Sequence, residues 1–213
     1  MCIVLVTRTK KYSIILSNRD EFLARPTIRA TWWPTPDNNI LAGRDLARPS
    51  HGTWLGITRQ GRIAVLTNYR EECEQDAAAA AVSRGEITKE FLLSEKDVEE
   101  WIQEVLESGV YSTVGGFSLM CGIFRKGGRG FAVVSNRSSL ERGADYVLEE
   151  EREDIGYECT GLSNSLIHDE WPKVKMGKEL LYKLKEEDIK DEEKFIEKCF
   201  ELLSYGPCSK LLM

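Results

Sequence analysis

The residue best suited to nucleophilic chemistry is Cys2, which directly follows Met1. Removal of Met1 would leave Cys2 with a thiol and a free α-amine on one residue. An α-amine titrates near pH ~7.7–8, so part of it is unprotonated at neutral pH and can accept the thiol proton directly or through water. This pair supplies a nucleophile and a base without histidine. The alternative is that Cys2 is only a small apolar residue at the start of a buried strand.

The remaining cysteines and histidines give little support for a metal site. The chain has six cysteines and two histidines, and no two cysteines have the Cys-x-x-Cys spacing of many zinc sites. Neither His51 nor His168 lies in an obvious nucleophile context. We therefore expect no metal and no cofactor, and we expect free thiols in a reducing intracellular compartment.

The tetrapeptide Asn18-Arg19-Asp20-Glu21 directly follows the apolar run at 12–17. Residues 2–7 are also β-branched and aliphatic, so the two runs predict a hairpin of buried strands. The end of the second strand would then return beside Cys2. There, Arg19 could lower the pKa of the thiol or bind an anionic group, and Asp20 could orient the amine. An ordinary turn with a local ion pair is the alternative.

Two asparagines stand at the ends of apolar segments. Asn68 follows the run at 63–67, and Asn164 follows residues 161–163. An amide NH₂ at such a position can stabilise a developing oxyanion. Asparagine is also a common turn former, so a structural role for each is the alternative.

Composition indicates one acidic, folded domain. The chain has 213 residues, of which 42% are apolar and 30% charged, and its net charge is −6. This length suffices for a core without disulfides or metals, and we expect residues 1–213 to form a single domain. The acidic balance argues against a nucleic-acid partner. No apolar stretch is long enough for a transmembrane segment or a signal peptide, so we expect a cytoplasmic protein.

The elements that must position these residues follow from hydrophobic periodicity. Residues 25–39 contain three prolines and predict loop or turn, and 71–87 could be a helix or a mobile connection. Charged segments at 125–129 and 149–154 are expected to be turns. The order of strands and helices predicts an α+β fold with helices layered on antiparallel sheet. Strands are expected at 2–7, 12–17, 40–42, 53–58, 63–67, 116–124, 130–135 and 156–163, and helices at 87–95, 97–108, from 172 onward and at 191–204.

Taken together, these residues resemble the NRDE family of transport and Golgi organization proteins, which is named for the tetrapeptide at 18–21. The resemblance rests on many short motifs that run in order along the chain. They lie at residues 1–3, 17–22, 25–26, 32–33, 40–45, 52–57, 61–62, 66–69, 84–85, 161–164 and 171–173.

The resemblance implies both a fold and a set of site residues. The NRDE family is similar to the N-terminal-nucleophile hydrolases, whose fold is a four-layer αββα sandwich. Within that class it looks closest to cysteine amidases, in which a processed N-terminal cysteine attacks the carbonyl. The counterparts of the catalytic residues would be Cys2, Arg19, Asp20, Asn68 and Asn164.

The resemblance leaves three functions open. It implies roles in Golgi organization, secretion, and lipid and haem homeostasis, with the chain binding a hydrophobic anionic ligand such as acyl-coenzyme A or haem. The second function is hydrolysis of an amide or thioester by Cys2, and the third is a non-catalytic scaffold for secretory membranes. Association with the Golgi or mitochondria would fit these roles. In the binding hypothesis, the ligand would contact Asn18, Glu21, Arg25, Trp33, Arg44 and Trp54.

The C-terminal residues depart from the family pattern. Members usually continue after the last helices into a Tyr-Gly-Thr-Arg-like segment and further strands, whereas Tyr205-Gly206 is followed here by Pro207 and six more residues. We therefore expect the sandwich to lack its C-terminal strands, and the absent arginine weakens the amidase hypothesis. An exposed sheet edge would favour a homo-oligomer.

Overall fold

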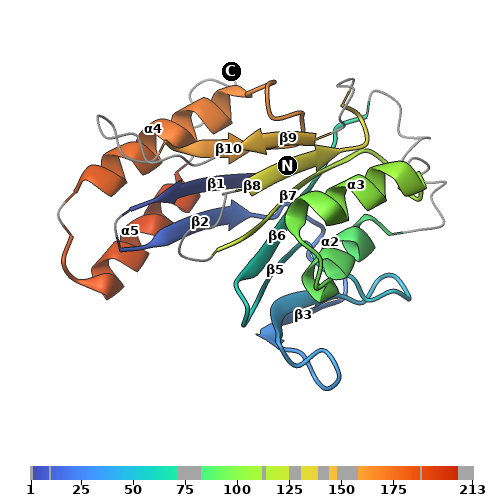
Figure 1. Ribbon diagram of the computed structural model, residues 1–213. Coiled ribbons are helices and arrows are strands. Elements are labelled where there is room, and N and C mark those ends of the chain that lie inside the picture. Colours follow the sequence, from blue (N-terminus) through green and yellow to red (C-terminus); the bar gives the residue numbers. More distant parts are fainter. Residues whose placement is uncertain are drawn as a thin grey trace.

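The computed structural model describes residues 2–9, 11–71, 83–111, 114–124, 131–138, 144–147, 158–187 and 189–205, with the backbone alone at 144–147. These residues form two antiparallel sheets with helices on their outer faces (Figure 1). No helix among them is long and apolar enough to cross a membrane.

The smaller sheet has the strand order β10-β1-β2. Its central strand β1 (Ile3–Arg8) pairs antiparallel with β2 (Ser13–Asn18) and with β10 (Thr160–Leu162). In the β1–β2 hairpin, Ile3 lies opposite Asn18. The predicted hairpin is therefore confirmed, and it returns the 18–21 tetrapeptide to the start of β1.

The larger sheet is a seven-stranded antiparallel meander in which neighbouring strands follow one another in the sequence. Each strand pairs with the next, so no crossover connection is needed within this sheet. In order, the strands are β3 (Thr27–Trp32), β4 (Ile40–Asp45), β5 (Leu55–Thr58), β6 (Arg62–Asn68), β7 (Phe117–Ile123), β8 (Phe131–Ser135) and β9 (Ala144–Val147).

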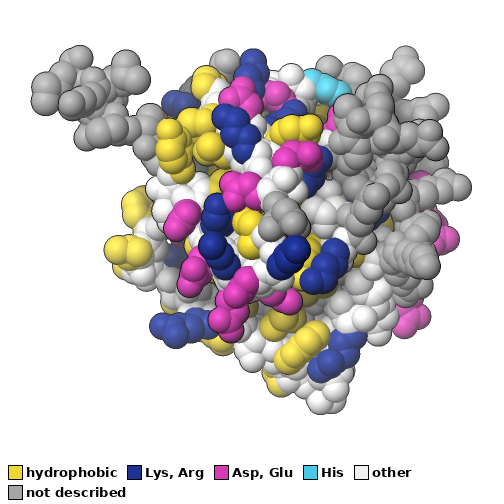
Figure 2. Space-filling model, turned by 90° about the vertical axis from the view of Figure 1, so that its left-hand side faces the viewer, with side chains coloured by type: hydrophobic (Ala, Val, Ile, Leu, Met, Phe, Trp, Pro, Cys, Tyr) yellow, Lys and Arg dark blue, Asp and Glu magenta, His cyan; other side chains and the backbone are white. Residues whose placement is uncertain are grey.

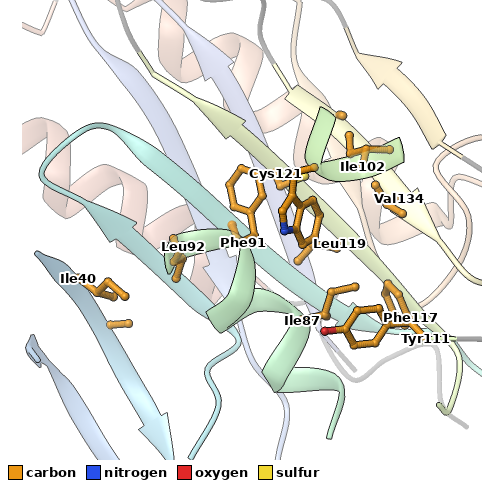
Figure 3. Close-up of a cluster of buried hydrophobic side chains, with 14 of the residues drawn as sticks. Ile40, Ile87, Phe91, Leu92, Ile102, Tyr111, Phe117, Leu119, Cys121 and Val134 are labelled. Atoms are coloured by element: carbon orange, nitrogen blue, oxygen red, sulfur yellow. The ribbon is translucent and has the colours of Figure 1, made fainter. Parts of the chain in front are cut away.

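Helices α2 (Arg84–Leu93) and α3 (Val98–Ser108) cover the outer face of the larger sheet. Helices α4 (Pro172–Glu186) and α5 (Glu192–Ser204) cover that of the smaller sheet. Figure 3 shows the apolar cluster under α2 and α3, including Phe91 and Leu119.

Two more apolar clusters lie between the other pairs of layers. One lies between the two sheets and includes Val4, Val65 and Met120. The other lies between the smaller sheet and its helices and includes Leu5 and Leu181. Three apolar clusters separate four layers, so the predicted αββα sandwich is confirmed.

The prediction of loop throughout 25–39 is wrong for β3, and β9 was not expected. Strand β3 lies between Pro26 and Pro34, which flank it without interrupting its hydrogen bonds. Its six residues alternate between polar and apolar types, as strand residues often do, but all six are exposed at the sheet edge. The prolines on either side of it therefore led to the prediction of a loop. Residues 72–82, 125–130 and 148–157, which contain most of the other expected turns and the alanine run, lie outside the described residues.

Helix α4 packs unusually close to the smaller sheet. A Cβ atom at Gly177 would lie 2.8 Å from Leu5 Cδ1, and one at Gly161 would lie 2.6 Å from Val174 Cγ1. Both distances are shorter than normal carbon–carbon contacts. The two glycines therefore allow α4 to lie directly on β1 and β10, which places the start of α4 near the start of β1.

A groove lies between β2 and α5, with a volume of about 400 Å³. Its lining is mostly apolar and includes Ile14, Leu16 and Phe195. Among the described strands, β2 pairs only with β1. Figure 2 views the molecule from this side and shows hydrophobic side chains between groups of charged ones. The homo-oligomer expected through a sheet edge stays a prediction.

Candidate functional site

The cavity that contains Cys2 has a volume of about 150 Å³ and opens to solvent. It lies where the first strand, the loop after β2, the strands of the larger sheet and the start of α2 meet, so both sheets contribute to it. Its lining residues are Cys2, Arg19, Asp20, Glu21, Arg25, Asp45, Arg48, Thr53, Trp54, Leu66, Asn68, Ser83, Arg84, Gly85 and Gly115.

Cys2 is partly buried, and its backbone carbonyl accepts two hydrogen bonds. Ser163 Oγ and Lys173 Nζ each donate to this oxygen at 2.8 Å. Burial raises the pKa of the thiol above its usual value, while the positive charges of Arg19 and Lys173 act in the opposite direction. Two cations therefore favour the thiolate at a site where burial disfavours it.

Arg19 is held by two contacts beside Cys2. Its guanidinium lies over the ring of Trp54, with Cζ 4.0 Å from the ring centroid. Its Nη2 donates to Glu21 Oε2 at 3.3 Å. Stacking and the ion pair together fix the direction of this cation. Asp20 lines the same cavity.

Arg25 and Asp45 form a second ion pair in the cavity lining, and Glu21 Oε2 lies 3.6 Å from Arg25 Nε as well as 3.3 Å from Arg19 Nη2. Arg25 Nη2 donates to Asp45 Oδ2 at 2.8 Å, and Arg25 Nε lies 3.1 Å from the same oxygen. Burial would raise the pKa of Asp45, but hydrogen bonds from Arg25 and from the Ala47 N–H lower it below its usual value. The carboxylate therefore stays ionised and holds the Arg25 side chain at the cavity.

Arg84 is the first residue of α2 and is partly buried. Its Nη1 donates to the backbone carbonyl of Gly116 at 3.2 Å. Burial lowers the pKa of Arg84, the charge of Glu71 raises it, and the charges of Arg25 and Arg48 lower it further. Four arginines and three carboxylates thus line one small cavity, and a bound anion would offset the repulsion among the arginines.

The two asparagines differ in their position relative to the cavity. Asn68 lines the cavity, whereas Asn164 Nδ2 donates to the backbone carbonyl of Asn68 at 2.6 Å. Asn164 Oδ1 is buried without a hydrogen-bond partner in the described part of the chain. Asn164 therefore supports the backbone at Asn68, and a role for either side chain as an oxyanion donor stays a prediction.

Three residues predicted to bind ligand lie away from this cavity. Asn18 Nδ2 donates to the carbonyl of Leu203 at 2.7 Å, on the side of α5. Trp33 is 2% exposed, and its indole N–H donates to the carbonyl of Ala42. Arg44 lies over the ring of Trp33, with Cζ 4.3 Å from its centroid. The ring and its cation are therefore part of the packing around β4.

Sequence reasoning had assigned no role to Arg48, Arg84, Ser163 or Lys173. Arg84, Ser163 and Lys173 each belong to a short motif of the family resemblance, and this was the signal that could have identified them. The proximity of Arg84 and Lys173 to Cys2 depends on how α2 and α4 pack against the sheets, and spacing along the chain does not reveal it. Among the described residues, no three histidine, cysteine or acidic side chains gather as metal ligands would.

The sequence matches a family model described as Transport and Golgi organisation 2 over residues 1–209. The chain belongs to this family. It is 36% identical over 223 aligned positions to an uncharacterized protein of Saccharomyces cerevisiae, an alignment that covers 96% of this chain and 69% of the yeast protein. It is also similar to the Transport and Golgi organization protein 2 homologs of Bos taurus (31% identical) and Homo sapiens (30%), with 84% of this chain and 63% of each homolog covered.

The fold is that of an N-terminal-nucleophile hydrolase. A solved structure of the Caenorhabditis elegans ortholog of N-acylethanolamine-hydrolyzing acid amidase superposes with a TM-score of 0.55, and the alignment covers 98% of this chain and 88% of the amidase. The sequence identity is 15%, so the similarity concerns the fold and says nothing of the substrate.

Proposed function

We propose that the protein binds the anionic end of a small hydrophobic ligand in the cavity beside Cys2. The observation that carries this proposal is the set of four arginines in the lining, which outnumber the three carboxylates. Guanidinium groups bind carboxylate and phosphate well because their donors match the geometry of both anions. Arg19 and Arg25 are already oriented by ion pairs, so a ligand would not have to order them.

The size of the cavity limits what can enter it. Its volume of about 150 Å³ is below the roughly 300–1,000 Å³ of sites that enclose a drug-sized ligand. A carboxylate, a phosphate or an acyl carbonyl would fit, while the rest of the ligand would stay at the mouth. Phe22 and Leu23 are 84% and 105% exposed between the lining residues Glu21 and Arg25, and they could contact an acyl chain there.

Among the two ligands considered, this geometry favours acyl-coenzyme A over haem. Acyl-coenzyme A is flexible and carries phosphates and a thioester carbonyl, each of which is small enough for the cavity. The haem ring would have to remain outside and present only its propionates. A role of this binding in Golgi organization would be in keeping with the names of the mammalian relatives.

Isothermal titration calorimetry with palmitoyl-coenzyme A tests the proposal, and haem serves as a second probe. We expect saturable binding that weakens with salt. Arg84→Gln should bind roughly 10- to 150-fold more weakly, because a charged hydrogen bond contributes ~1.5–3 kcal/mol. Arg59→Gln is the matched control, since Arg59 is exposed and lies over Trp32 outside the cavity lining. The proposal is wrong if neither probe binds saturably, or if both variants bind like the unaltered protein.

A second candidate function is hydrolysis of an amide or thioester, and the position of Cys2 in the same cavity as Arg19, Asp20 and Asn68 favours it. After removal of Met1, the amine of Cys2 would accept the thiol proton, and the thiolate would attack the acyl carbon. The amine would return the proton to the leaving nitrogen or sulfur. Water would then attack the acyl thioester on Cys2, return one proton to the thiol and release the acid.

A further inference from the structure

Cys2 is held at its backbone carbonyl by two donors from distant parts of the chain. Ser163 follows β10, and its hydroxyl donates to this oxygen at 2.8 Å. Lys173 is the second residue of α4, and its ammonium donates to the same oxygen at 2.8 Å. Ser163 is fully buried, and Lys173 is partly buried. An ammonium and a hydroxyl thus converge on one peptide oxygen beside the reactive thiol.

The position of Lys173 follows from the close packing of α4. Trp171 precedes the first turn and Pro172 begins it, which fixes where the helix starts. Gly177 and Gly161 let the helix lie close to β1 and β10. Lys173, one turn before Gly177, can therefore reach the carbonyl at the start of β1.

The carbonyl matters because of what happens to residue 2 if Met1 is removed. The residue then has no peptide bond on its amino side, and it precedes the paired residues of β1, which begin at Ile3. Its carbonyl becomes the backbone group that sets its orientation. Two hydrogen bonds to that oxygen fix the peptide plane, and with it the directions of the α-amine and of the thiol.

We propose that Lys173 is a positioning residue for Cys2, which it orients through the residue 2 carbonyl while its charge favours the thiolate. This inference rests on the second candidate function, in which Cys2 is the reactive group. Lys173 is not among the residues that line the cavity, so it acts through Cys2 and does not contact the ligand.

The electrostatic balance of the pair supports this role. Burial lowers the pKa of Lys173, and the interaction with Cys2 raises it. The same interaction lowers the pKa of Cys2 against the effect of burial. The attraction between the two groups therefore opposes the effect of burial at both partners, although burial remains the larger effect on each pKa.

The test measures the rate of Cys2 alkylation by iodoacetamide from pH 6 to 10, with peptide mapping by mass spectrometry to isolate Cys2 from the other cysteines. Lys173→Gln keeps a neutral donor and removes the charge. We expect its apparent thiol pKa to rise by about 0.5–1, so alkylation at pH 7 slows ~3–10-fold. The rate constant of its thiolate, taken from a fit to the whole pH profile, should equal or slightly exceed that of the unaltered protein, since a more basic thiolate is more nucleophilic.

Lys173→Met separates positioning from charge, because it removes the donor as well. We expect the same rise in apparent pKa. In addition, we expect the fitted rate constant of the thiolate to fall about 3-fold or more. Lys173→Arg keeps charge and donor and should restore both values. Lys175→Met is the matched control, since Lys175 is exposed on the same helix, and it should leave the profile unchanged.

The outcomes separate this inference from the proposed functions. If Lys173→Gln and Lys173→Met both give the profile of the unaltered protein, the inference is wrong. If Lys173→Met does not fold, the Gln and Arg variants still decide the effect of charge. Binding of palmitoyl-coenzyme A should persist in the Lys173 variants. Loss of binding in these variants would contradict the claim that Lys173 acts only through Cys2. A Cys2 that stays unreactive at every pH would overturn the hydrolytic function together with this inference.

Discussion

The cysteines of this chain differ in their surroundings, and this decides which thiol can react. Cys121 is fully buried in the larger sheet, and burial raises its pKa to about 12. Burial also raises the pKa of Cys199. Cys2 is less buried, and Arg19 and Lys173 counteract the effect of burial on its thiol. Because the thiolate is the nucleophile, Cys2 is the best candidate for acylation among these three.

A thiol-directed acyl probe and mass spectrometry test this at the residue scale. We expect the mature protein to lack Met1 and to carry the probe on Cys2. Cys2→Ala should abolish labelling at that site, whereas Cys199→Ala should leave it intact. Retention of Met1, or labelling that persists in Cys2→Ala, would contradict the hydrolytic function and leave the binding function untouched.

Part of this site could be predicted from the sequence because it depends on local geometry. A hairpin of two runs that begins at residue 2 must return the 18–21 tetrapeptide beside Cys2, and the register confirms this. Arg84 and Lys173 could not be placed in the same way, since each reaches the site from a helix that packs on a sheet. Trp33 was predicted to bind ligand, yet it is buried under α2 and α3 with the larger sheet.

At the scale of elements, α4 both covers the smaller sheet and brings Lys173 to Cys2. A methyl group at Gly177 would lie 2.8 Å from Leu5 Cδ1 and 3.1 Å from Leu5 Cδ2. Leu5 is 1% exposed and has little room to move. The helix would have to shift outward, and the ammonium of Lys173 would shift with it.

We therefore expect Gly177→Ala to destabilise the protein by ~1–2 kcal/mol, because overpacking outweighs the ~1 kcal/mol that alanine gains over glycine in a helix. Alkylation of Cys2 should slow at the same time. Urea denaturation and the alkylation assay measure the two effects, and Glu179→Ala on the exposed face of α4 is the control. An increase in stability would show that α4 does not need this close contact.

The elements that sequence patterns missed lie at the margins of the larger sheet. Strand β3 is exposed along its whole length, and the prolines around it outweighed its alternation of polar and apolar residues. It exists because β4 offers it a partner, with Thr27 opposite Asp45 and Trp32 opposite Leu41. The strands with clear apolar runs, such as β1, β2 and β6, are those that pack a face against an apolar cluster, and β2 does so although it pairs only with β1 among the described strands.

For the whole molecule, the layer between the two sheets connects stability to the site. Cys2 precedes β1 of the smaller sheet, whereas Asn68 and Trp54 belong to the larger sheet and its connections. The cavity can form only if the two sheets keep their spacing. That spacing depends on the inter-sheet cluster, in which Met120 is 1% exposed.

Met120→Ala should therefore weaken stability and ligand binding together. We expect a loss of ~2–5 kcal/mol in the free energy of unfolding, as for other large-to-small core substitutions, and weaker binding of palmitoyl-coenzyme A. Met120→Leu conserves the volume and should cost less than ~1.5 kcal/mol. Circular dichroism and tryptophan fluorescence should follow one urea transition, since the sheets share this core. Two separate transitions would mean that each sheet and its helices unfold independently, and the cavity would then not depend on the inter-sheet layer.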